Sequence, residues 1–243
     1  MLIPEDMESN STFSHKNRPF LTWQLIIDWA EEHYRSRIFS KDELVPTRPG
    51  LLYLVQKGFI RLTGSTYAVP SNKKSKPKPV ETNPEEQTFL GFVGPGQPFE
   101  LVQTSPYKLQ AYADSQETTV LWMYWQDLDN WPHFRREVLD AFRYQHQRKL
   151  LWLSVLGQRR TIDRLYGSIV LLAEEFGEPY QWGDKLEERG DRLPWLLTHA
   201  QIGTAIGATR VTVTRMMGQL RQQGLIHILE DNYICMPVKL KSN

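Results

Sequence analysis

The feature that most constrains this chain is a pair of short helices joined by a glycine, predicted over residues 198–222. Thr198 and Gln201 form the T-x-x-Q pattern of a capping box, in which each side chain bonds an otherwise unpaired backbone N–H at a helix start. The first helix should end at Ile206-Gly207-Ala208, because glycine permits the positive φ of a tight interhelical turn. Thr209 then caps a second helix. The sequence therefore predicts a helix-turn-helix.

The second of these helices has two unlike sides. We expect its inner side to be buried; it consists of Val213, Met216, Met217 and Leu220. The outer side near its start combines arginines with an aliphatic residue and has no carboxylate. An arginine fork matches guanine O6 and N7 in the major groove, an aliphatic side chain meets the thymine methyl, and hydroxyls suit phosphates. We therefore expect contacts to double-stranded DNA from Thr198, Thr209, Arg210, Val211, Thr212, Thr214 and Arg215.

The segment after the second helix supports the same interpretation. Gly224 closes that helix, and LIHILEDNYICM predicts two strands around Glu230-Asp231-Asn232, which would form a wing. A purely structural helical hairpin is the alternative. The capped short helix, the glycine turn, the arginine-bearing helix start and the wing occur together in this order, which favours DNA binding.

The charge of the chain is nearly balanced, with 29 basic and 28 acidic residues and a net charge of +1. Within residues 195–229 the only charged side chains are Arg210, Arg215 and Arg221. A near-neutral chain with arginines on one short helix is not suited to promiscuous binding. We expect its affinity for DNA to depend on dimerisation and on a defined site.

Upstream, the pattern predicts helices at the ends and short strands between them. Residues 22–34 form an amphipathic helix with Trp23, Ile26, Ile27 and Ala30 on one face. We expect a β-hairpin over 51–62 that turns at Gln56-Lys57-Gly58, a strand at 88–93, and two strands within 109–125. These short strands suggest a small β-barrel or jelly roll. The lysine- and proline-rich segment 70–88 is expected to be a solvated loop, although its lysines could also touch DNA or a partner.

A long helix is predicted from Pro132 to Leu156, because no glycine or proline interrupts it after its first residue. Residues at 3- and 4-residue steps form a seam of the coiled-coil type: Leu139, Phe142, His146, Lys149, Leu153 and Leu156. We expect such a helix to pack against a partner helix. The alternative is that it packs only against its own chain. A further helix is expected over 161–176, followed by a polar connection from Glu178 to Arg192.

Several segments of the chain resemble those of a known family. The segment LTHAQIGTAIGATRVTVTRMMGQLRQQGLI resembles the winged helix-turn-helix of the CRP/FNR superfamily of transcription regulators, and R-V-T-V-T-R is similar to the recognition helix of the cyanobacterial NtcA branch. LLYLVQKGFIRL and FLGFVGPGQPFEL resemble the hairpin and the effector cassette of that family's β-roll, and 133–157 matches its dimer helix. The resemblance covers about 220 residues in collinear order.

The resemblance implies an α+β fold with a cyclic-nucleotide-binding-like β-roll, a long dimerisation helix and a winged helix-turn-helix. We expect a loose arm over 1–20, the β-roll effector-like domain over 21–131, the dimerisation helix over 132–157 and the DNA-binding domain over 158–243. The implied function is a homodimeric transcription regulator that reads a GTA/TAC-like inverted repeat. RNA polymerase is the further partner that we expect, and we expect neither catalysis nor catalytic residues.

The resemblance also points to an effector site. Glu100 matches the family's ribose-binding glutamate, but Tyr107-Lys108 falls where an arginine-serine pair would bind a cyclic phosphate, which argues against cyclic AMP. The NtcA-like branch implies 2-oxoglutarate, and the candidate contacts are Glu100, Lys108, Arg143, Arg148 and Lys149. A degenerate, empty site, with activity set by abundance or a protein partner, is the alternative.

Other cofactors and a membrane location receive little support. With Cys235 as the single cysteine, an iron–sulfur cluster or a cysteine metal site is not expected. A haem ligand could come only from a histidine such as His33, His133 or His146, and an exposed histidine is the commoner case. No stretch has the apolar length of a membrane span, and the first residues lack a signal-peptide pattern. We expect a cytoplasmic protein.

Overall fold

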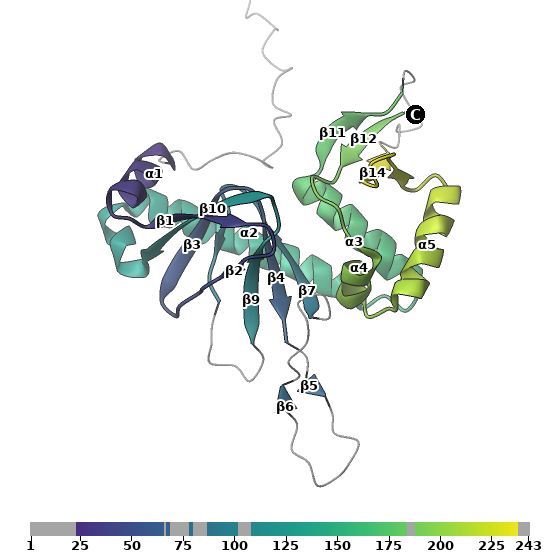
Figure 1. Ribbon diagram of the computed structural model, residues 1–243, viewed down its shortest axis with the longest axis horizontal. Coiled ribbons are helices and arrows are strands. Elements are labelled where there is room, and N and C mark those ends of the chain that lie inside the picture. The colour runs from purple at the N-terminus through teal and green to yellow at the C-terminus, as the bar shows by residue number, and fades with distance from the viewer. Residues whose placement is uncertain are drawn as a thin grey trace, which may run out of the picture.

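The computed structural model describes residues 23–65, 67–68, 78–79, 87–101, 108–183 and 188–237. The predicted arm over 1–20 and most of the lysine- and proline-rich segment lie outside these residues. Within them, a β-roll and a helical C-terminal part lie along one long helix (Figure 1). This is the predicted α+β class.

The first helix forms because its apolar residues recur at helical spacing. It is α1, Trp23–Glu32. Ile26, Ile27 and Ala30 are buried as predicted, where they meet Leu121 and Phe134 in one apolar cluster. This cluster anchors α1 to the outer side of the roll and to the start of the long helix.

The β-roll is made of two four-stranded antiparallel sheets that enclose an apolar core. The first sheet has the order β1 (Ser36–Ser40), β10 (Glu117–Tyr124), β3 (Leu51–Lys57), β8 (Pro98–Phe99). The second has the order β2 (Leu44–Val45), β9 (Leu109–Ala113), β4 (Ile60–Gly64), β7 (Thr88–Val93). A two-stranded ribbon of β5 (Tyr67–Ala68) and β6 (Lys78–Pro79) extends from the roll (Figure 1).

The predicted β-hairpin over 51–62 is wrong in its pairing, although both of its strands exist. β3 pairs with β10 and β8 in the first sheet, whereas β4 pairs with β7 and β9 in the second. Gly58 lies at the crossing with φ +76°, and a Cβ there would lie 2.6 Å from the Glu117 carbonyl oxygen. The chain therefore passes from one sheet to the other at a glycine that leaves room for the start of β10, and the local sequence does not reveal this approach.

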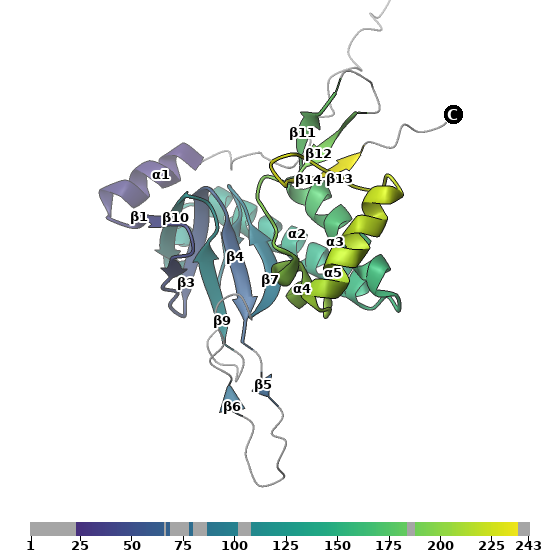
Figure 2. The same ribbon diagram turned by 45° about the vertical axis from the view of Figure 1, so that its right-hand side comes forward.

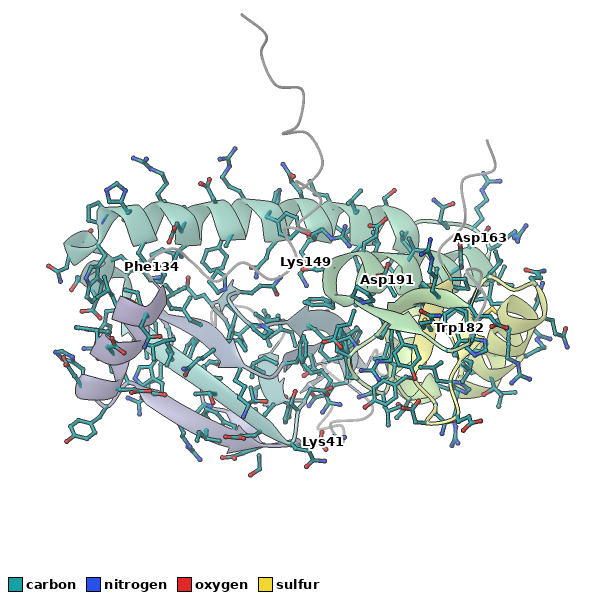
Figure 3. All side chains as sticks on the ribbon, turned by 90° about the horizontal axis from the view of Figure 1, so that it is seen from above. Lys41, Phe134, Lys149, Asp163, Trp182 and Asp191 are labelled. Atoms are coloured by element: carbon teal, nitrogen blue, oxygen red, sulfur yellow. The ribbon has the colours of Figure 1, made fainter. Side chains whose placement is uncertain are left out.

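The two central helices follow the prediction closely. The six-residue 3-10 helix Trp125–Asn130 leads into α2 (Pro132–Leu156), and α3 (Thr161–Phe176) follows after a short break. α2 runs along the whole side of the β-roll and ends beside the C-terminal part (Figure 3). Leu165, Ile169 and Leu172 form the buried face of α3, as its spacing predicted.

The C-terminal part combines two short helices with a four-stranded sheet. The helices are α4 (His199–Ile206) and α5 (Arg210–Gln222). The sheet has the order β11 (Glu178–Gln181), β12 (Arg189–Arg192), β14 (Ile234–Pro237), β13 (His227–Ile228). The predicted polar connection over 178–192 is therefore wrong in part, because it contains β11 and β12. Their outward side chains are polar and half-exposed, so the hydrophobic alternation that marks a strand is missing.

One apolar cluster joins the β-roll to the helix-turn-helix. α4 packs directly against β7, and this contact can be followed in Figure 2. Phe89 and Phe92 of β7 lie in the same core as Trp195, Ile202 and Ile206 of the C-terminal part. The backbone N–H of Phe89 donates a hydrogen bond of 3.3 Å to the side-chain hydroxyl of Thr204, which reinforces the contact. The orientation of the helix-turn-helix is therefore set by the β-roll as well as by α3.

Candidate nucleic-acid interface

The first helix of the helix-turn-helix begins with the predicted capping box. Thr198 Oγ1 accepts a hydrogen bond from Gln201 N at 3.1 Å, and Gln201 Oε1 accepts one from Thr198 N at 2.9 Å. The helix ends at Gly207, whose φ of +67° is left-handed. A Cβ on Gly203 would lie 2.6 Å from the Ala208 carbonyl oxygen, so this glycine lets the turn fold back against α4. The sequence predictions of the cap and of the turn are confirmed.

The second helix is capped and oriented as expected. Thr209 Oγ1 accepts a hydrogen bond from Thr212 N at 3.2 Å, which starts α5 at Arg210. The four residues predicted for its inner side are all buried: Val213, Met216, Met217 and Leu220. They lie in one cluster with Ala205 and Ile206 of α4. This packing fixes the outer side of α5 toward solvent.

The outer side of α5 presents two unpaired cations at its start. Arg210, Thr214 and Arg215 are exposed, and Val211 is 78% exposed. Neither arginine forms an ion pair with any carboxylate of the described residues, although nine other arginines and lysines of those residues do. An exposed aliphatic side chain beside two guanidinium groups without an ion-pair partner suits an anionic, grooved partner.

His199 is a residue of this surface that sequence reasoning missed. Its Nδ1 lies 2.8 Å from Thr214 Oγ1 on the outer side of α5. Burial lowers the pKa of His199 from its ordinary value, and the Arg210 charge lowers it further. Its position directly after the Thr198 cap, at the start of a helix-turn-helix, was the signal that could have found it.

The wing is present where the sequence predicted it. β13 and β14 pair, and the turn between them closes with a hydrogen bond of 3.0 Å from Leu229 N to Tyr233 O. Asn232 takes a left-handed φ of +66°, which asparagine tolerates better than most residues. The wing therefore lies beside α5 as the edge of the C-terminal sheet.

A second feature is a cavity of about 290 Å³ between the β-roll, α2 and α3. Three of the five predicted effector contacts line it: Glu100, Arg148 and Lys149. The other two lie elsewhere. Lys108 is exposed, and Arg143 is exposed and pairs with Asp140 at 2.9 Å. The walls are mainly apolar and include Phe92, Phe99, Phe142, Trp152 and Phe176.

Lys149 supplies the free positive charge of this cavity. It lies on the side of α2 that faces the β-roll (Figure 3), and its Nζ donates a hydrogen bond of 2.7 Å to the Leu90 carbonyl oxygen. Burial of the ammonium lowers the pKa of Lys149, and the Glu175 charge acts in the opposite direction. Lys149 forms no ion pair within the described part of the chain. The cavity can therefore hold a small molecule with an apolar body and one anionic group.

The other two predicted contacts that line the cavity are already occupied by the chain's own side chains, as is Glu175, a further charged residue of its lining. Arg148 bonds to Glu175 at 3.3 Å, to Glu174 at 3.1 Å and to the Leu171 carbonyl oxygen, all on α3. Glu100 accepts a hydrogen bond of 3.2 Å from Trp125 Nε1. The bonds of Arg148 connect α2 to α3, and the bond of Glu100 connects the end of β8 to the 3-10 helix. Both side chains therefore stabilise the walls of the cavity.

The outer side of α2 carries an apolar surface. Leu139, Leu150, Leu151 and Leu153 are each about half-exposed or more, and His146 is also exposed. The predicted seam is only partly on this side, because Phe142 packs beside Trp125 and Leu156 packs against the C-terminal core. Lys149 faces the cavity instead. Of the predicted seam, Leu139, His146 and Leu153 are exposed and can meet a partner helix, and Leu150 and Leu151 add exposed apolar surface outside the seam.

The described residues offer little for redox or metal chemistry. Cys235 is buried, and burial raises the pKa of its thiol to about 12. No group of three His, Cys, Asp or Glu side chains that could hold a metal occurs in the part of the chain that the structure describes. None of its helices combines the length and apolar character needed to cross a bilayer.

Comparison with known proteins agrees with this geometry. Residues 154–241 match the family model of the Crp-like helix-turn-helix domain. The chain is 28% identical over 192 residues to the regulatory protein CysR of Synechococcus elongatus, which covers 78% of each chain. It is 36% identical over 78 residues to the global nitrogen regulator of Synechocystis sp., which covers 32% of each chain. Both relatives are regulators by name.

Solved structures share the whole fold. A cyclic nucleotide-binding domain containing protein from Listeria monocytogenes aligns with a TM-score of 0.64 and 13% identity, over 88% of this chain and 96% of its own. A CooA mutant from Carboxydothermus hydrogenoformans aligns with a TM-score of 0.61 and 17% identity, over 90% of this chain and 92% of its own. The predicted architecture of β-roll and helix-turn-helix is confirmed.

Proposed function

We propose that this chain, a DNA-binding transcription regulator of the CRP/FNR type, works as a homodimer whose two α5 helices read the two halves of an inverted repeat. Regulators of this type bind DNA and act as dimers. The observation that carries the proposal is the pair of unpaired, exposed arginines, Arg210 and Arg215, beside exposed Val211 at the start of α5. The half-sites would lie one helical turn apart, roughly 34 Å.

The outer side of α5 suggests which groups each residue reads. Arg210 and Arg215 would donate to guanine or to its neighbour, and Val211 would meet a thymine methyl. Thr198, Thr209 and Thr212 lie at the two helix starts, where exposed N–H groups and hydroxyls suit phosphates, and Thr214 completes the surface. The resemblance of R-V-T-V-T-R to the recognition helix of the NtcA branch implies a GTA/TAC-like palindrome.

Dimerisation would run through α2. Its exposed leucines present apolar surface that water disfavours, and a symmetric contact with a second copy would bury it. In this proposal residues 21–131 form the sensing domain, 132–157 the dimerisation helix and 158–243 the DNA-binding domain, after an arm over 1–20. The dimer bound to DNA would contact RNA polymerase, which is the further partner in this proposal.

The test compares two duplexes of equal length. Fluorescence anisotropy of the purified dimer on a GTA-N8-TAC duplex and on a scrambled duplex, at several salt concentrations, measures base readout apart from phosphate binding. We expect tighter binding to the palindrome at every salt concentration. Equal affinity for the two duplexes would refute base readout.

The cavity suggests control by a small anion, with 2-oxoglutarate as the candidate. Lys149 offers an ammonium without an ion-pair partner, and the aromatic walls would hold the carbon skeleton. Among the predicted contacts, Lys149 would bind the anion, and Glu100 and Arg148 would hold the walls of the cavity. Lys108 and Arg143 lie outside the cavity lining, so they would not contact the ligand in this arrangement. A ligand that favours one arrangement of α2 over another would shift the populations of the two recognition-helix orientations.

Control without an effector is the second candidate, because charged residues of the cavity already have partners within the chain. Arg148 and Glu100 are satisfied by the chain's own side chains, so the cavity holds together without a ligand. In this alternative the regulator needs no effector, and its abundance or a protein partner sets its activity.

A further inference from the structure

His199 links the two helices of the helix-turn-helix at their solvent side. It is the first residue of α4, and its imidazole reaches Thr214 on the outer side of α5. Thr214 Oγ1 also donates a hydrogen bond of 3.0 Å to the Arg210 carbonyl oxygen. His199 of α4 is therefore joined through Thr214 to Arg210 of α5, on the surface that is proposed to contact DNA.

The bonding pattern favours one tautomer of the imidazole. The Thr214 hydroxyl has one hydrogen, which the Arg210 carbonyl oxygen accepts in the 3.0 Å bond. With that bond made, Thr214 Oγ1 accepts from His199 Nδ1–H at 2.8 Å. The remaining nitrogen, Nε2, has no hydrogen-bond partner among the described residues and is free to take up a proton.

The surroundings of His199 disfavour that proton in the free protein. On α5 the Arg210 charge acts on the imidazole, and together with burial it lowers the pKa of His199. β7, which packs against α4, carries no titratable side chain. On α3, Arg164 bonds to the Ile206 carbonyl oxygen at the far end of α4, while Glu174 and Glu175 are paired with Arg148. Asp163 of α3 is likewise paired, with Arg160 at 3.1 Å. Burial and the Arg210 charge are thus left to act on His199 without an opposing carboxylate among the described residues.

DNA would reverse this balance. The starts of α4 and α5 place N–H groups and the positive ends of two helix dipoles beside His199, which is where a phosphate would bind. A phosphate there supplies the negative charge that the free protein lacks and an acceptor for Nε2–H. Binding would therefore draw a proton from solvent onto each imidazole.

We propose that His199 is a DNA-contacting residue that holds the Thr214 hydroxyl through Nδ1 and, on taking up a proton, donates Nε2–H to a DNA phosphate. This proposal rests on the DNA-binding function proposed above. Affinity for DNA then rises as pH falls through the pKa of His199 in the complex, and levels off below its pKa in the free protein. Because a dimer carries two copies, up to two protons accompany binding.

The experiment measures DNA affinity of the full-length dimer at about pH 6 and about pH 8, at constant ionic strength, across the range in which histidine titrates. His199→Asn keeps a donor at the Nδ1 position without titrating, and His133→Asn removes an exposed histidine at the start of α2 as the matched control. We expect wild type and His133→Asn to bind about ten-fold tighter at pH 6, since each unit of pKa rise gives about ten-fold. His199→Asn should lose most of this gain.

Two results would overturn the proposal. If His199→Asn keeps the wild-type dependence on pH, or if the wild type shows none, His199 takes up no proton on binding. If the wild type binds no duplex at either pH, the proposed function fails and this proposal with it. His199→Ala should in addition bind more weakly at pH 8, because Thr214 loses its donor, while thermal melting reports whether each variant is folded.

Discussion

The ring of Trp195, in the segment before α4, stacks on the ring of Phe59 in the β-roll, with the centroids 4.8 Å apart. Phe92 meets the same indole edge-on at 4.2 Å. The two rings of the roll and the indole before the helix-turn-helix thus belong to one continuous core. The β-roll is therefore packed directly against the segment that leads into α4.

Trp195→Ala should open a cavity in this shared core. We expect the free energy of unfolding to fall by about 3–5 kcal/mol, as for other buried aromatic truncations. Chemical denaturation measures it. Trp195→Phe is the matched variant: it keeps the stacking and removes the buried Nε1, which has no hydrogen-bond partner, so it should cost less than about 1.5 kcal/mol. Equal losses in both variants would show that the ring stacking, which Phe retains, does not stabilise the contact.

Arg210→Ala tests base readout at one position. We expect the variant to lose about 1–3 kcal/mol of binding free energy on the palindromic duplex and little on a scrambled one. Arg221→Ala, on the exposed last turn of α5, is the matched control and should affect the palindrome much less. Anisotropy titrations of both variants provide the comparison. An unchanged affinity of Arg210→Ala would remove that residue from the interface.

Leu150→Asp combined with Leu153→Asp should separate the dimer, because charges would replace two half-exposed leucines on the outer side of α2. Sedimentation equilibrium should show a monomer that binds the palindrome weakly. Leu25→Asp changes an equally exposed leucine on α1 and should leave the dimer intact. A dimeric double variant would place the interface elsewhere.

Lys149→Met tests the cavity as an anion site. Isothermal titration with 2-oxoglutarate should give heat with the wild type and none with the variant, whereas cyclic AMP should give none with either. Lys149 is an exposed residue whose ammonium bonds the Leu90 carbonyl oxygen, so the variant should remain folded, which thermal melting checks. Silence of the wild type with both ligands would favour the regulator without an effector.

The elements that carry local signals were predictable from the sequence. The capping box at Thr198, the left-handed turn at Gly207 and the apolar spacing of α3 each depend on residues within one or two helical turns. The outer side of α5 followed from the same spacing. For these features the structure adds distances and little else.

Features that depend on distant contacts could not be predicted in this way. β3 and β4 enter different sheets because each pairs with strands distant in sequence, and the Glu117 carbonyl approaches Gly58 where the chain crosses. Arg148 resembles a ligand contact in sequence, but Glu174 and Glu175 of α3 already hold it. The role of Phe59 likewise depends on Trp195, more than a hundred residues away. In each case a partner remote in sequence decides the outcome.

The central claim is that two copies of this chain read one inverted repeat. Selection of bound duplexes from a random library, with the wild-type dimer, tests it most directly. We predict enrichment of an inverted repeat with GTA- and TAC-like halves whose centres lie roughly 10 base pairs apart. Enrichment of a single half-site, or of no sequence at all, would contradict the account.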